Sequence, residues 1–153
     1  YKGDVVRSCI HCHQIGDAFR SSYHDQGKPV PTELIHPWPG PEALGLALTA
    51  DHVARVESVT PGSLAAGAGF QAGDDLVSLA GQPLVSQADV SWALHHAPGS
   101  GPVVAVVKRA GTEKSLTLDL PEDWRRKSDI SRRVGTWAMR GWASGGLVLE
   151  DLD

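Results

Sequence analysis

The sequence has little of several features that would assign it to a common class of protein. It holds only two cysteines in 153 residues, and they lie within four positions of each other, which excludes the disulfide network of small secreted proteins. No apolar run approaches the roughly 18 residues that cross a bilayer. A formal net charge of −4 indicates no nucleic-acid partner. The apolar fraction of 41% is enough for one core, in an ordinary domain with flanking segments.

The chain divides by composition into three parts. We expect a cysteine-bearing segment with a proline-rich linker at 1–41, a folded domain at 42–121, and a tryptophan-rich extension at 122–153 that packs on the domain. Five prolines within residues 28–41 argue against a continuous helix, so this stretch is predicted to be extended. The chain begins at Tyr1 without a methionine or a signal pattern, so we expect a piece of a longer protein.

Several segments of the central part carry strand signals. Residues 46–48 and 116–120 alternate leucine with other residues, a pattern that predicts half-buried strands. Residues 103–107 are continuously apolar, as is typical of a central strand covered on both faces. Between the last two runs, residues 109–112 contain a glycine where a hairpin turn needs a positive φ.

Two short helices are predicted between the strands. Ser63 follows Pro-Gly and should begin a helix of one or two turns that ends at Gly67. Ser86 should begin the second helix, with a carboxylate three residues later in the pattern of a capping box. Four-residue spacing places Val90 and Leu94 on one apolar face of this helix.

The order of these motifs resembles a known family. The run PGSLAAGAGFQAGDDLVSLAGQPL at 61–84 is similar to the P-G-S-P-A-A-x-A-G-L-x-x-G-D-x-I stretch of PDZ domains of the bacterial HtrA-like type. Leu64 stands where proline is usual, and Phe70 stands where leucine is usual. The resemblance implies an α+β, mainly β fold. We expect a partly open β-sandwich or barrel of five to six strands with two helices, plus N- and C-terminal extensions.

The same resemblance implies a groove that binds peptides. In PDZ domains an extended peptide, usually a C-terminus, adds as a strand to an open sheet edge beside a helix. The positions that match the family's groove are Leu44, Gly45, Leu46, Ala47, Leu48, Gln87, Ser91 and Leu94. Backbone N–H groups of the loop would hold a terminal carboxylate, and glycine would let the ligand approach closely. The leucines of the strand and helix would receive the ligand's last side chain.

Two features leave both the class of ligand and the binding of a peptide undecided at this point. Gln87 stands where many PDZ domains use a histidine to select Ser or Thr in the ligand, so the resemblance does not indicate a ligand class. In addition, most of the leucines and glycines in the pattern would be needed for folding even if no peptide bound.

The N-terminal segment contains the run CIHCH, which has C-x-x-C-H spacing. This run resembles a c-type haem attachment site, which implies thioether links at Cys9 and Cys12 and an iron ligand at His13. The residues also fit a metal site, in which His11 or His13 and His24 would join the two cysteines as zinc ligands. A redox pair, a structural disulfide and two free thiols are further alternatives.

Three functions therefore stay open. The first is a non-catalytic module that binds a peptide or protein C-terminus, which could be the recognition part of a redox protein with a thioredoxin-like domain upstream. The second is an electron-transfer protein with covalent haem. The third is the regulatory PDZ domain of a serine protease, although neither G-x-S-x-G nor G-N-S-G-G occurs in the chain. We expect no enzyme activity in this fragment, no certain cofactor, no membrane insertion, and a bacterial periplasmic or exported location. The sequence does not indicate the oligomeric state.

Overall fold

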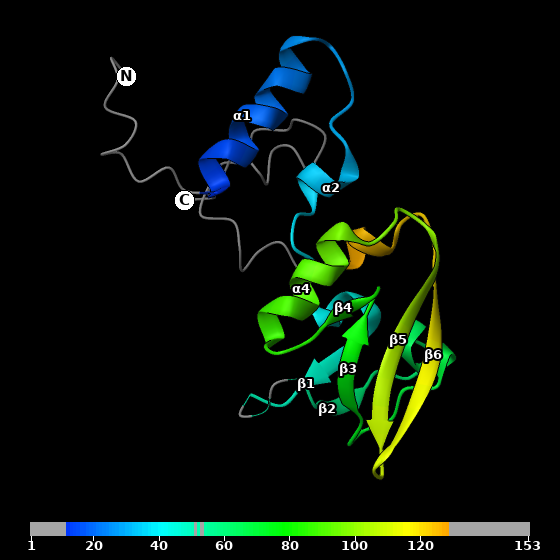
Figure 1. Ribbon diagram of the computed structural model, residues 1–153. Coiled ribbons are helices and arrows are strands. Elements are labelled where there is room, and N and C mark those ends of the chain that lie inside the picture. Colours follow the sequence, from blue (N-terminus) through cyan, green and yellow to red (C-terminus); the bar gives the residue numbers. More distant parts are fainter. Residues whose placement is uncertain (1–11, 51, 53, 129–153) are drawn as a thin grey trace, which may run out of the picture. The chain divides into compact units, whose positions relative to one another are not determined.

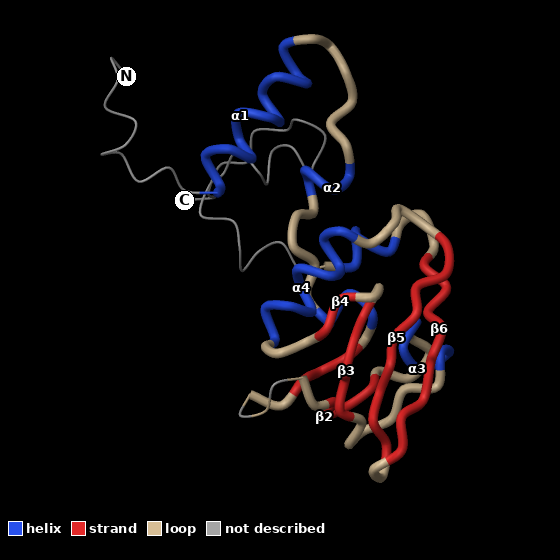
Figure 2. Tube along the Cα trace, in the orientation of Figure 1, coloured by secondary structure: helices blue, strands red, loops and turns tan. Residues whose placement is uncertain are grey.

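The computed structural model describes residues 12–50, 52 and 54–128, with only the backbone described at 12–14. The described residues fall into two compact units, 12–35 and 36–128. Figures 1 and 2 show their helices and strands. No helix in these ranges is long and apolar enough to cross a membrane.

The first unit consists of two helices, α1 (Cys12–Asp25) and α2 (Thr32–Ile35). Arg20 joins them, because its buried guanidinium donates hydrogen bonds to the Leu34 carbonyl (2.7 Å) and to the Asp17 carboxylate. The prediction that 28–41 is wholly extended is wrong, since α2 lies within it. Proline does not prevent this helix, because Pro31 precedes its first turn, where a missing N–H breaks no hydrogen bond.

The second unit has six described strands in two antiparallel sheets. The strands are β1 (Leu46–Leu48), β2 (Val56–Val59), β3 (Asp75–Leu79), β4 (Gln82–Pro83), β5 (Gly101–Arg109) and β6 (Thr112–Leu120). The helices are α3 (Leu64–Ala68) and α4 (Gln87–His96), with 3₁₀ turns η2 (Pro41–Leu44) and η3 (Trp124–Lys127). One sheet pairs β1 with β2, and the other has the order β4-β3-β5-β6. The predicted α+β, mainly β architecture is confirmed.

The β5–β6 hairpin is the longest pairing in the second unit. Its turn is confirmed where it was predicted, with positive φ at Ala110 (49°) and Gly111 (83°). The expectation that the apolar run of β5 is covered on both faces is wrong. Val103 and Val107 are buried, whereas Val104 is 49% exposed. Successive residues of a strand point to opposite faces, and only one face of this sheet packs on the core.

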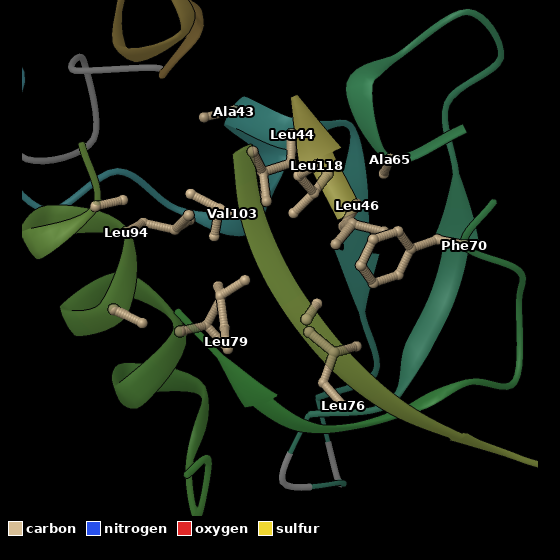
Figure 3. Close-up of a cluster of buried hydrophobic side chains, with 14 of the residues drawn as sticks. Ala43, Leu44, Leu46, Ala65, Phe70, Leu76, Leu79, Leu94, Val103 and Leu118 are labelled. Carbon is tan, nitrogen blue, oxygen red and sulfur yellow. The ribbon is translucent and has the colours of Figure 1, made fainter. Parts of the chain in front are cut away.

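The two helices of the second unit begin where their caps predict. The Ser63 hydroxyl accepts the Ala66 N–H (3.2 Å), and Ser86 forms the capping box that starts α4. Helix α3 continues past Gly67 to residue 68, and the left-handed Gly69 that follows ends it. The apolar face of α4 is buried in the core that Figure 3 shows.

A buried ion pair ties the start of β3 to the end of β5. Asp74 has no exposed surface, and its carboxylate accepts hydrogen bonds from Arg109 Nε (2.6 Å) and Nη2 (2.8 Å) and from the Gln71 N–H (3.0 Å). Burial alone would raise the pKa of Asp74, but these hydrogen bonds and the nearby positive charge hold it below its ordinary value. Asp74 is therefore a charged anchor of the fold.

Candidate peptide-binding groove

Strand β1 leaves one of its edges unpaired among the described strands. The Gly45 carbonyl accepts the Thr60 N–H (2.8 Å), which shows that Gly45 faces β2. In an antiparallel ladder every second residue directs its N–H and C=O groups toward the partner strand. Leu46 and Leu48 therefore direct these groups toward the opposite edge, where no described strand lies. This edge is the main feature that strand addition requires.

Helix α4 is the element predicted to form the second wall of the groove, and two hydrogen bonds fix its direction. At its first residue, Gln87 Nε2 donates to the carbonyl of Thr49, which directly follows β1 (2.7 Å). At its other end, His95 Nδ1 accepts the backbone N–H of Trp38 (3.3 Å), and Trp38 lies just before η2. Helix α4 thus runs in the direction opposite to η2 and β1. We call the end beside η2 the near end and the end beside Thr49 the far end.

The near end is shaped by Gly45. This residue has φ 84°, a left-handed conformation that ends η2, and its N–H donates to the Glu42 carbonyl (2.9 Å). A Cβ atom on Gly45 would collide with the Ser63 side chain, so the site requires glycine for space as well as for conformation. The Gly45 N–H, one of the loop amides predicted to hold a ligand carboxylate, therefore forms a hydrogen bond inside the turn instead. The Leu46 N–H is the one directed at the open edge.

The floor of the groove is made of core leucines. Leu46 is 3% exposed and Leu94 is 0% exposed, so the two side chains belong to the hydrophobic core together with Leu44. Figure 3 shows Leu94 directed from α4 into this core, toward Val103. Leu48 is only partly buried. Contact between a ligand side chain and the buried leucines would require the walls to separate.

The remaining predicted residues occupy the two walls. The Ala47 side chain is exposed, on the face of β1 opposite to Leu46. Ser91 is half-buried on α4, one turn after Gln87. The Gln87 side chain already has hydrogen-bond partners within the protein. Its amide donates to the Thr49 carbonyl and approaches the His52 carbonyl at 3.5 Å. The structure thus brings the predicted residues together around β1 and α4.

An open hollow of about 420 Å³ adjoins the far end. It is lined by His52, Ala54, Asp75, Leu76, Val77 and Leu84. Four of these six side chains are apolar, and His52 also contributes the carbonyl that Gln87 approaches. The hollow is therefore next to the contact between Gln87 and the connection of β1 to β2, through their shared residue His52.

Arg125 is a residue of the near end that sequence reasoning missed. It is 4% exposed, and its Nη2 donates to the carbonyls of His95 (3.1 Å) and Ala97 (2.7 Å) at the end of α4. Its guanidinium also lies 4.6 Å from the ring centre of the buried Trp124. A cation at a helix C-terminus is favourable. Arg125 follows Ala97 by 28 residues in the chain, so no local sequence pattern could predict this contact.

Exposed rings surround the end of α4. Trp38 stacks on His95 with ring centres 4.1 Å apart, and Trp92 stacks on His96 at 4.0 Å. Burial lowers the pKa of His36, and the positive charges of Arg126 and Arg125 lower it further. Trp38 contacts α4 through His95 while it stays 38% exposed.

The cysteine motif lies mostly outside the described residues. Cys9 and His11 are outside them, as are the side chains of Cys12 and His13. Helix α1 begins at Cys12, and the exposed side chains of Ile15 and Phe19 follow it at helical spacing. Within the described residues no group of three His, Cys, Asp or Glu side chains is placed to hold a metal ion.

Comparisons with known proteins give structural similarity only. No protein-family model matches the chain, and no curated protein matches it. One similar structure is the HtrA3 PDZ domain bound to a phage-derived ligand (FGRWV), with 22% identity over 51% of this chain and 83% of that chain, and a TM-score of 0.43. Another is a serine endoprotease from Yersinia pestis, with 15% identity over 71% of this chain and 35% of that chain, and a TM-score of 0.49. The chain thus spans about a third of that endoprotease.

The strand order and the position of α4 define the class of fold. The six described strands form two open sheets, and the ten-residue helix α4 contacts the residue that follows β1 through Gln87. This is an open, two-sheet α+β fold, as the resemblance to PDZ domains predicted, and the surface between β1 and α4 is the candidate functional site.

Proposed function

We propose that the second unit is a non-catalytic module that captures the C-terminal end of an extended peptide by strand addition to β1. The observation that carries the proposal is the unpaired edge of β1, which directs the backbone groups of Leu46 and Leu48 toward the groove. A free terminal carboxylate would lie at the near end, next to the Leu46 N–H. Main-chain hydrogen bonds supply the affinity, since the leucines of the floor are buried.

The experiment removes one backbone donor from the edge. Proline at position 48 lacks the N–H that a peptide carbonyl would accept, and proline is tolerated on an open strand edge. Leu48→Ala is the matched control, because it shortens the side chain and keeps the N–H. The probe is a fluorescent hexapeptide with an apolar last residue and a free carboxylate, with its C-terminal amide as the second probe.

We expect the wild-type protein to bind the free-acid peptide with a Kd in the micromolar range, about −8 kcal/mol, as measured by fluorescence anisotropy. Leu48→Ala should weaken binding by a few-fold, and Leu48→Pro should weaken it by a further few-fold to about tenfold, the value of one lost hydrogen bond. Thermal unfolding of both variants checks that they fold. Equal affinity of the alanine and proline variants, or of the acid and amide peptides, would contradict the proposal.

We propose covalent haem attachment to the first unit as a second candidate function. Helix α1 starts at Cys12, so the C-x-x-C-H run lies at the start of a 14-residue helix. Ile15 (47% exposed) and Phe19 (56% exposed) lie three and seven residues after Cys12, on its face of the helix. A flat apolar group held at the run could cover these side chains. A redox role of the thiols is the rival proposal for the same residues.

Expression with a haem-attachment system tests this candidate. We expect a haem absorption band that survives denaturation and that Cys12→Ser removes, because a thioether bond resists unfolding. Phe19→Ser should keep the covalent haem and increase its exposure to solvent. Absence of covalent haem, together with a reversible disulfide detected by thiol labelling, would favour the redox role instead. Neither result bears on the groove.

A further inference from the structure

We propose that the Gln87 side chain limits the length of peptide that the groove accepts, because it bridges the two walls at the far end. The proposal rests on the peptide-binding function proposed above. It concerns a contact that is present in the described residues before any ligand binds.

The bridge joins the two walls directly. Gln87 is the first residue of α4, whereas Thr49 and His52 belong to the connection between β1 and β2. The side-chain amide carries two N–H donors. It donates to the Thr49 carbonyl at 2.7 Å and approaches the His52 carbonyl at 3.5 Å. A peptide that lies between β1 and α4 must end its contact here or displace the amide from these carbonyls.

The distance from the near end to the bridge fixes the length. Four residue steps separate Gly45 from Thr49, and an extended chain rises about 3.4 Å per residue, so the open edge is about 14 Å long. About four ligand residues fit along it. Within this length Leu46 and Leu48 supply the outward backbone groups, so the last residues of the peptide obtain all the main-chain hydrogen bonds that the edge offers.

Ligand residues further upstream would reach the hollow beyond the bridge. Four of its six lining residues are apolar, and His52, whose carbonyl the amide approaches, is another of them. Apolar upstream residues could bury surface there once the amide is displaced. In the wild-type protein this gain is opposed by the loss of the Gln87 hydrogen bonds. Gln87 is therefore a specificity-determining residue for peptide length.

The experiment compares two peptides that share their last four residues. One is a tetrapeptide that ends in a valine carboxylate, and the other is an octapeptide with leucines at the upstream positions. Gln87→Glu keeps the size of the side chain and removes both donors, and an acidic residue in the first turn of a helix is favourable for folding. Gln87→Leu removes the donors without adding charge. Gln26→Glu, in the first unit, makes the same change of charge at another exposed glutamine.

In the wild-type protein and in Gln26→Glu we expect the two peptides to bind within about twofold of each other. In both Gln87 variants the octapeptide should bind about five- to tenfold more tightly than the tetrapeptide, as measured by calorimetry. A tenfold preference of the wild-type protein for the octapeptide, or the same ratio of affinities in wild type and variants, would overturn the length limit. Neither result would contradict peptide binding in the groove. Failure of both peptides to bind the wild-type protein overturns the groove and the length limit together.

Discussion

The near and far ends of the proposed groove are held in different ways. At the near end, Gly45 takes a left-handed conformation in close contact with Ser63, and the buried Arg125 caps the end of α4. At the far end, the walls are joined by an exposed side-chain amide, that of Gln87. The difference suggests a division of roles. The end that would hold a carboxylate has a fixed shape, while the end that admits upstream residues can be altered by one substitution.

Gly45→Ala should have the largest effect on this comparison. Alanine at a left-handed position costs about 1–2 kcal/mol, and the collision with Ser63 adds about 1–3 kcal/mol. We expect the free energy of unfolding in urea to fall by about 2–5 kcal/mol and peptide binding to be lost. Gly111→Ala is the control, because Gly111 also has positive φ but no atom within 4 Å of an added Cβ. Equal destabilisation by the two substitutions would contradict the close contact.

Arg125→Met should have an intermediate effect. It keeps most of the apolar stem and removes the hydrogen bonds to the His95 and Ala97 carbonyls. Leaving buried carbonyls without a donor costs about 1–3 kcal/mol, and the loss should appear as weaker hydrogen-exchange protection at the end of α4. Arg126→Met makes the same change of charge at an exposed neighbour and should be close to neutral. Equal effects would mean that charge alone, and not the cap, matters.

The smallest predicted effect is on the pH dependence of His36. Its pKa is lowered in the folded state, so the unfolded chain binds a proton more readily. The stability that this histidine contributes is therefore complete above the unfolded pKa, about 6.5, and decreases as the pH falls below it. An NMR titration should give His36 a pKa below that of an unfolded peptide, and Arg126→Gln should raise it. A pKa at or above the ordinary value would contradict the described environment.

Local signals were enough to predict much of the second unit. The Arg109–Thr112 turn, the Ser63 and Ser86 caps and the apolar face of α4 each depend on residues within four positions of one another. The role of β1 and α4 as the two sides of a groove followed from the family resemblance. Whether the residues predicted from it bind a peptide is a question for the experiments above.

The interactions that shape the site could not be predicted in the same way. Gln87 contacts a carbonyl 38 residues earlier in the chain, and Asp74 pairs with an arginine 35 residues later. Such contacts depend on how elements far apart in the sequence pack together, and residue spacing does not predict that packing. The apolar run of β5 was misleading for a related reason. Its composition does not say which face the core covers, so the exposure of Val104 could be known only from the assembled sheet.

The Asp74–Arg109 ion pair has a consequence for where this module can work. Because the pKa of Asp74 lies below its ordinary value, the stability that the carboxylate gives is present above about pH 4 and declines only as the pH falls through the lower folded value. An acidified compartment at about pH 5 would therefore leave this ion pair charged as it is at neutral pH, and the link between β3 and β5 would persist there.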